Sequence, residues 1–180
     1  MVWRDAVRQD RFLLEGFRCT SDPARRPDRR PLPHPRPWEV AVQKWARTQR
    51  PPSGTDERLR LGIDPDGDLL TTVGEVCLLR VEDDIAAVKM TGIALAAGRR
   101  GTGGHIADSA VEDLIRCSSE LAAAQGASGM IVVAWVHPLN APSQRMLDRN
   151  GFCWRSRISD DIEDWILQAG PAELTMTRDG

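Results

Sequence analysis

The sequence predicts an α+β domain built on a mixed, mostly antiparallel sheet with a central parallel β-α-β unit and flanking helices. Alternating apolar residues between 57 and 96, interrupted by short polar turns, predict three antiparallel strands. An amphipathic helical pattern follows, and then a short apolar run at residues 130–136. Such a run is typical of a buried strand with a parallel neighbour, which a right-handed crossover would reach.

Length and charge set broad limits on the function. The chain has 180 residues with 24 Lys plus Arg against 26 Asp plus Glu, a net charge of −2. One domain of this size can bury a core without disulfides or metals. The near-neutral balance disfavours nucleic acid as a partner. No apolar run approaches the roughly 20 residues of a membrane span, so we expect neither export nor membrane insertion.

The four cysteines are scattered and form no C-x-x-C pair. This spacing predicts reduced thiols, no zinc site and a cytoplasmic location. No other metal site is expected.

The N-terminal part, residues 1–56, reads as two helices and a long loop. Apolar spacing predicts a first helix at residues 10–18 and a second at 38–47, which begins just after Pro37. Between them, residues 20–37 contain six prolines and five arginines, a composition that forbids continuous helix or sheet. Trp38 and Trp45 are expected on the buried face of the second helix.

The remainder, residues 57–180, alternates strands with two helices. A helix is expected at residues 104–125, with Ile106, Ala110, Leu114, Cys117 and Leu121 forming one apolar stripe. A short helix at 140–149 and strands at 152–158 and 173–177 complete the prediction. The acidic residues between 160 and 164 are interpreted as a solvated loop, and Trp135 and Trp154 as core or cleft residues.

The most informative segment is a glycine-rich loop at residues 99–104 between a predicted strand and a predicted helix. Glycines let successive backbone amides approach a phosphate closely, and the helix adds its positive N-terminal dipole. The loop therefore predicts a phosphorylated ligand. It lacks the Gly-Lys-Ser/Thr of a P-loop, and it does not follow the first strand as a dinucleotide fingerprint does.

Two motifs in this order resemble the GNAT superfamily of acyl-CoA N-acetyltransferases. Arg100-Gly101-Thr102-Gly103-Gly104-His105 is similar to its R/Q-x-x-G-x-G/A pyrophosphate loop, except that His105 replaces a small residue. The segment from Asn140 to Phe152 resembles its N-x-x-S-x-x-x-L-x-x-x-G-F pattern. The resemblance covers roughly residues 58–158.

This resemblance implies direct transfer of an acetyl group from acetyl-CoA to a primary amine, such as a small amine or a peptide N-terminus. In the family, the strand before the glycine loop pairs its backbone with the pantetheine and polarises the thioester oxygen. Here that strand is residues 91–95. The implied acetyl-CoA contacts are Ile93, Leu95, Arg100, Gly101, Thr102, Gly103, Gly104, His105, Asn140 and Ser143.

The catalytic acid is the point at which the chain departs from many family members. They place a tyrosine on the second motif's helix, whereas this chain contains no tyrosine and has Leu147 there. The pattern of Ser143 and Leu147 resembles the branch that acetylates ribosomal-protein N-termini, in which a serine can protonate the thiolate. Ser143 is the implied acid, and a helix-capping role for its hydroxyl stays open.

For the general base, Glu75 lies in the central strand of the predicted meander, where partial burial would raise the pKa of its carboxyl. The alternative is a solvated strand carboxylate. His137, at the end of the second parallel strand, is the rival base, although its position before Pro138 favours a turn residue without a catalytic role.

Two other functions stay open. One is an inactive acyl-CoA-binding or interaction domain, and the other is a toxin-like acetyltransferase acting on aminoacyl-tRNA, which the basic loop at residues 20–37 could serve. In the enzyme interpretation, residues 1–56 form the acceptor side and residues 57–180 the acetyl-CoA-binding core of a single domain, and a homodimer stays open.

Overall fold

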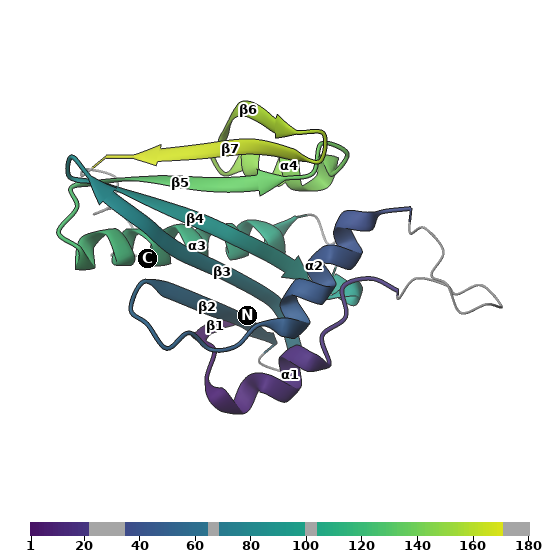
Figure 1. The fold of residues 1–180 in the computed structure, drawn as a ribbon. Coiled ribbons are helices and arrows are strands. Elements are labelled where there is room, and N and C mark those ends of the chain that lie inside the picture. Colours follow the sequence, from purple (N-terminus) through teal and green to yellow (C-terminus); the bar gives the residue numbers. More distant parts are fainter. Residues whose placement is uncertain (22–34, 65–68, 100–103, 171–180) are drawn as a thin grey trace.

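A computed structural model describes residues 1–21, 35–64, 69–99 and 104–170. Seven strands form one sheet in the order β1-β2-β3-β4-β5-β7-β6 (Figure 1). The strands are β1 (Val2–Asp5), β2 (Glu57–Asp64), β3 (Leu69–Glu82), β4 (Ile85–Leu95), β5 (Gly129–Val136), β6 (Cys153–Ser159) and β7 (Ile162–Ala169). The helices are α1 (Arg11–Glu15), α2 (Pro37–Thr48), α3 (His105–Ala124) and α4 (Ala141–Arg149), with short 3-10 turns at Arg8–Asp10 and Ala97–Arg99.

The predicted fold class is confirmed, including the parallel pair at the centre of the sheet. β4 and β5 pair in parallel from Ile85 opposite Gly129 to Met90 opposite Ala134. The other strand pairs among the described residues are antiparallel. β4 continues to Leu95 and β5 to Val136 beyond this register. The two strands therefore part after Met90 and Ala134.

Two apolar cores lie on opposite faces of the sheet. α3 packs on one face, and its stripe of Ala110, Leu114, Cys117 and Leu121 is buried as the sequence predicts. α1 and α2 cover part of the other face (Figure 1). The second core contains Leu14, Phe17, Ala46, Leu59, Leu61, Val73 and Ala94.

A buried ion pair joins β2 to α3. Arg60 donates from Nε to Asp113 Oδ2 at 2.7 Å and from Nη2 to Asp113 Oδ1 at 3.1 Å. Both side chains are less than a tenth exposed. The two parallel hydrogen bonds fix the height and rotation of α3 against the sheet.

The prediction of a solvated loop at residues 160–164 holds for the exposed turn at 160–161 and is wrong for Glu163 and Asp164. A turn at 160–161 leads directly into β7, where Glu163 and Asp164 are buried. Arg157 pairs with Glu163 at 3.1 Å, and Arg155 pairs with Asp164. These arginines on the neighbouring strand compensate the buried carboxylates, a cross-strand effect that a run of acids does not reveal. The strand expected at 173–177 lies outside the described residues.

Other predictions also need correction. β1 was not expected, and α1 is shorter than the helix predicted at 10–18. Trp135 and Trp154 are 49% and 54% exposed and pack in neither core. The Lys89 ammonium lies 3.5 Å from the ring centroid of Trp135 and covers part of this indole.

None of the helices in the described ranges is long and apolar enough to cross a membrane.

Candidate functional site

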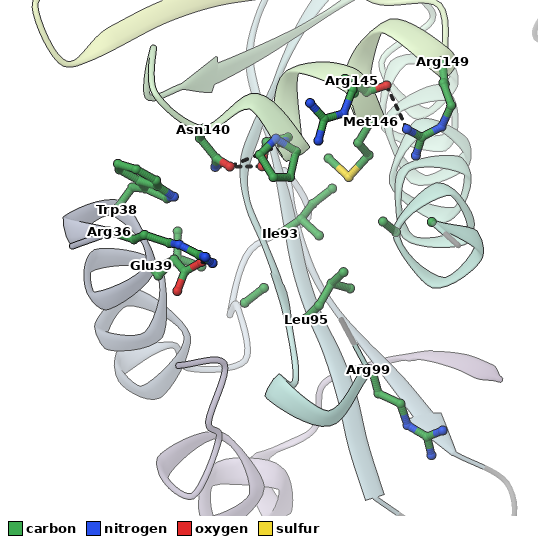
Figure 2. Close-up of a pocket in the computed structure, with 16 residues that line it drawn as sticks. Arg36, Trp38, Glu39, Ile93, Leu95, Arg99, Asn140, Arg145, Met146 and Arg149 are labelled. Atoms are coloured by element: carbon green, nitrogen blue, oxygen red, sulfur yellow. Dashed lines mark hydrogen bonds and ion pairs between the residues drawn. The ribbon is translucent and has the colours of Figure 1, made fainter. Parts of the chain in front are cut away.

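A cavity of about 540 Å³ lies between α2 and α4, over the part of β4 that β5 no longer pairs (Figure 2). Five of the expected acetyl-CoA contacts line it: Ile93, Leu95, Gly104, Asn140 and Ser143. The other described lining residues are Arg36, Trp38, Glu39, Val42, Ala94, Arg99, Ala107, Pro142, Arg145, Met146 and Arg149.

The β4 edge at this cavity presents backbone hydrogen-bonding groups. The Ala96 N–H donates to the Thr71 carbonyl at 2.7 Å, and the same register continues along β3 and β4 to Glu75 opposite Gly92. Residues of an antiparallel strand alternate between bonding their partner and pointing away from it. Ile93 and Leu95 are therefore the residues whose N–H and C=O groups point away from β3, toward the side that faces α4. An extended ligand with amide groups can pair with such an edge.

The N-terminus of α3 reaches the same cavity through Gly104. This residue caps the helix with a φ of 87°, and a Cβ at this position would lie 2.8 Å from Arg149 Nη2. The backbone conformation there favours glycine, and a Cβ would have to displace the Arg149 guanidinium. Arg149 is held by Asp108 at 2.7 Å. His105 is the first helical residue and is exposed, and it is absent from the described cavity lining.

The predicted phosphate loop itself, Arg100-Gly101-Thr102-Gly103, lies outside the described residues. The described residues on either side of it, Arg99 and Gly104, both line the cavity.

Asn140 caps α4 and orients Ser143. Its amide Nδ2 donates to Ser143 Oγ at 2.8 Å, and its Oδ1 accepts from the Ser143 N–H at 3.4 Å. Because Oγ accepts this bond, the hydroxyl hydrogen of Ser143 is free to donate to another group. Leu147, which stands where many family members have tyrosine, is buried in the core and does not face the cavity.

Glu75 lies on the sheet face that α2 covers, opposite Gly92, and is absent from the described cavity lining. Burial raises the pKa of its carboxyl, and the negative charge of Glu57 adds to this rise. Hydrogen bonds from Trp45 and Thr91 act in the opposite direction. The net result is a half-buried carboxyl that holds its proton to a higher pH than a solvated glutamate does.

His137 is held by neighbours at both ring nitrogens. Nδ1 accepts from the Leu139 N–H at 3.1 Å, and Nε2 lies 3.5 Å from Asp161 Oδ1. The ring centroid is 4.6 Å from that of Trp38, with an interplanar angle of 32°. The imidazole therefore braces Trp38 at the side of the cavity, and it is not itself among the lining residues.

The sequence predicted residues 1–56 as the acceptor side, but it did not single out the residues of α2 that line this site. Arg36, Trp38 and Glu39 line the cavity from the first turn of α2. The apolar pattern of that helix indicated only which face is buried. Pro37 marked where the helix begins, but no sequence feature indicated that its first residues face a cavity. Across the cavity stand the α4 arginines, Arg145 and Arg149 (Figure 2).

The charge of the lining is predominantly positive. Among the described residues that line the cavity, four are arginines and one is a carboxylate, Glu39. Backbone donors, a helix N-terminus and several guanidinium groups make this space suited to an anionic ligand with amide groups.

No family model matches the chain. No curated protein matches it either. Solved structures do match over nearly its whole length. A chimera of spermidine N-acetyltransferase SpeG from Vibrio cholerae with hSSAT is 14% identical, with a TM-score of 0.58, 99% of this chain covered and 100% of the other.

Two further structures are similar to the same degree. Ribosomal-protein-S5-alanine acetyltransferase from Vibrio fischeri is 17% identical with a TM-score of 0.55, with 92% of this chain and 90% of the other covered. A GNAT-family acetyltransferase from Streptococcus pneumoniae is 13% identical with a TM-score of 0.60, with coverages of 94% and 99%. The chain therefore has the GNAT acetyltransferase fold.

Proposed function

We propose that the protein is an N-acetyltransferase that moves an acetyl group from acetyl-CoA to a primary amine. The observation that carries the proposal is the β4 edge at Ile93 and Leu95, which meets the N-terminus of α3 in one cavity. The edge suits the amides of a pantetheine arm, and the helix N-terminus suits a pyrophosphate. Two solved structures with this fold are named as a spermidine N-acetyltransferase and a ribosomal-protein-S5-alanine acetyltransferase.

Individual residues have distinct parts in holding acetyl-CoA. Ile93 and Leu95 offer backbone groups to the pantetheine, and the segment from Arg100 to His105, including Gly104, offers amides to the pyrophosphate. Asn140 and Ser143 border the same cavity from α4. Arg145, exposed on α4 where this helix borders the cavity, adds a positive charge without being buried in the core.

The reaction needs one base and one acid. The lone pair of the acceptor nitrogen forms a C–N bond to the thioester carbonyl carbon, and the C–S bond breaks. A cationic acceptor gives one proton to water before the attack, and its nitrogen loses a second proton to Glu75 as the C–N bond forms. The coenzyme A thiolate leaves and takes a proton from Ser143, which water reprotonates. The raised pKa of Glu75 supports the first role, since a base works best when its pKa lies near the working pH. The free hydroxyl hydrogen of Ser143 supports the second.

The ribosomal-protein N-terminal acetyltransferase branch remains the closest in motif, because Ser143 and Leu147 follow its pattern. A solved member of that group is one similar structure among several. We propose residues 1–56 as the acceptor side, since α2 forms the cavity wall that faces α4.

Isothermal titration with acetyl-CoA tests the cofactor assignment. We expect wild-type binding in the micromolar range, and we expect Arg145→Glu to raise the Kd about tenfold by reversing a charge at the cavity. Arg80→Glu is the matched control, because Arg80 is 72% exposed at the opposite end of the β3–β4 hairpin. Absence of wild-type binding, or equal effects of the two reversals, would reject the assignment.

Turnover is tested by amine-dependent release of free thiol from acetyl-CoA. An enzyme loses rate in Glu75→Gln and Ser143→Ala, while both variants still bind acetyl-CoA. Tight binding without thiol release from any amine would instead indicate an acyl-CoA-binding domain.

A further inference from the structure

The charges that line the cavity are separated in space. Arg36 and Glu39 lie on the α2 side, whereas Arg145 and Arg149 lie on the α4 side, with Ile93 between the two groups (Figure 2). An anionic donor is attracted to the α4 side. The single carboxylate among the described lining residues, Glu39, stands on the opposite wall. That wall is where an acceptor would approach the exposed edge of β4.

The Glu39 carboxylate is well ordered by its neighbours. Its side chain is 12% exposed. Oε1 accepts from Arg36 Nη1 at 3.0 Å, and Oε2 accepts from Thr20 Oγ1 at 3.0 Å. A carboxylate with so little contact with water keeps a strong demand for a cationic partner, because removal of that partner leaves a poorly solvated charge.

Arg36 supplies this partner from a solvent-exposed position. Its side chain is 60% exposed, and it belongs to the residue that caps α2. The guanidinium keeps most of its contact with water in this pair, so a second cation that reached Glu39 would leave the carboxylate paired and the arginine solvated. Another cation of suitable shape can therefore take its place beside Glu39.

The wall next to this pair is aromatic. Trp38 lines the cavity and is backed by the ring of His137 at 4.6 Å. Because both nitrogens of His137 face partners of their own, the imidazole keeps Trp38 in position. An indole beside a carboxylate favours an organic cation with an apolar or aromatic body.

We propose that Glu39 binds the protonated amine of the acceptor and that Arg36 occupies the place of this ammonium group in the free protein. The acceptors are then primary amines that are cationic in solution and carry an apolar or aromatic body next to the amine. This inference rests on the proposed function, and it assigns Glu39 to binding and not to proton transfer. It makes Glu39 and Arg36 the residues that determine acceptor specificity.

Direct titration with amines tests the inference. The probes are benzylamine and tryptamine, each paired with its uncharged alcohol, benzyl alcohol or tryptophol, titrated calorimetrically into the protein with and without coenzyme A. We expect the amines to bind the wild type, Arg36→Ala to bind them about fivefold more tightly, and Glu39→Gln to bind them at least about tenfold more weakly. The alcohols should respond to neither substitution.

Arg11→Ala and Glu15→Gln are the matched controls. This pair has an N–O distance of 2.7 Å in exposed α1 and does not contribute to the described cavity lining. The tighter amine binding expected for Arg36→Ala cannot come from a folding defect. The inference can therefore still be tested if Glu39→Gln is destabilised. Where thiol release is measurable, Glu39→Gln should raise the KM for the amine and leave kcat within about twofold.

Several results would overturn the inference. The inference is wrong if both cavity variants bind amines as the wild type does, or if amines and alcohols respond alike. It is also wrong if neither amine binds the wild type or Arg36→Ala. A fall in kcat without a change in KM for Glu39→Gln would contradict it as well. The acetyl-CoA titration separates this failure from failure of the proposed function. If the protein binds amines but not acetyl-CoA, the cation site is supported and the transferase function is rejected. If it binds acetyl-CoA but not amines, only the cation site is rejected.

Discussion

The indole of Trp45 lies against the backbone of Gly92 so closely that a Cβ at residue 92 would be 2.9 Å from Trp45 Cη2. This contact seats α2 on β4 beside the cavity. It also places the Trp45 ring next to Glu75, the β3 residue opposite Gly92. The distance between α2 and the cavity floor is therefore set in part by the absence of a side chain at residue 92.

Gly92→Ala should displace Trp45 and lower the free energy of unfolding by about 1–3 kcal/mol, the usual range for overpacking. Urea unfolding measures the loss. Gly98→Ala is the control, because a Cβ there would have no heavy atom within 4 Å, and its effect should stay within about 0.5 kcal/mol. Combining Gly92→Ala with Trp45→Phe should restore part of the loss. Equal effects at the two glycines would contradict the steric explanation.

The buried pair of Arg60 and Asp113 gives a second prediction, about stability. Asp113→Ala leaves a guanidinium with 8% exposure without its bidentate partner, which should cost about 3–5 kcal/mol. Glu15→Ala removes the carboxylate of the exposed pair with Arg11 and should cost less than about 1 kcal/mol. Urea unfolding of both variants checks the contrast, and similar losses would show that burial does not decide the energy of these pairs.

Asn140 and Ser143 form the α4 cap, and we expect their substitutions to have different effects, one on stability and the other on the rate. Asn140→Ala removes the α4 cap and should lower the free energy of unfolding by about 1 kcal/mol. Ser143→Ala keeps the capping bond to the Ser143 N–H and should instead lower kcat about a hundredfold. Ser143→Thr, which retains a hydroxyl, should recover most of the rate. A stability loss with full activity in Ser143→Ala would assign its hydroxyl to capping alone.

The sequence predicted those parts of the fold that depend on local periodicity. The meander, the apolar stripe of α3 and the parallel strand at β5 follow from patterns of period 2 and 3.6. β7 was missed because its buried acids, Glu163 and Asp164, depend on Arg157 and Arg155 of the adjacent strand. No local pattern encodes that compensation.

The same limit applies to the candidate site. Ile93, Gly104 and Ser143 were expected from motifs and do line one cavity. Arg36 and Glu39 were missed because their importance comes from tertiary packing: α2 crosses the end of the sheet and brings them opposite α4 (Figure 1). A helical pattern indicates which face is buried, but it does not indicate what lies across from the first turn.

The pKa of Glu75 gives a prediction about pH. A base must be ionised, so kcat should rise with pH through the pKa of Glu75, which burial and Glu57 raise above the ordinary glutamate value of 4.5. The rising limb of the rate profile should therefore lie at a higher pH than for a solvated carboxyl. Glu75→Gln should remove this limb and lower kcat by about 10²–10⁴-fold. A variant that keeps the wild-type profile would exclude Glu75 as the base.

The same shift also predicts the pH dependence of stability. Between the unfolded value near 4.5 and the higher folded pKa, the native state binds more protons at Glu75 than the unfolded state does. The free energy of unfolding therefore falls as pH rises through this interval. Glu75→Gln has no proton to lose, so its stability should fall less than that of the wild type across the same interval. Urea unfolding of both proteins at a series of pH values measures this difference, and parallel curves would show that burial does not penalise the ionised Glu75 carboxyl.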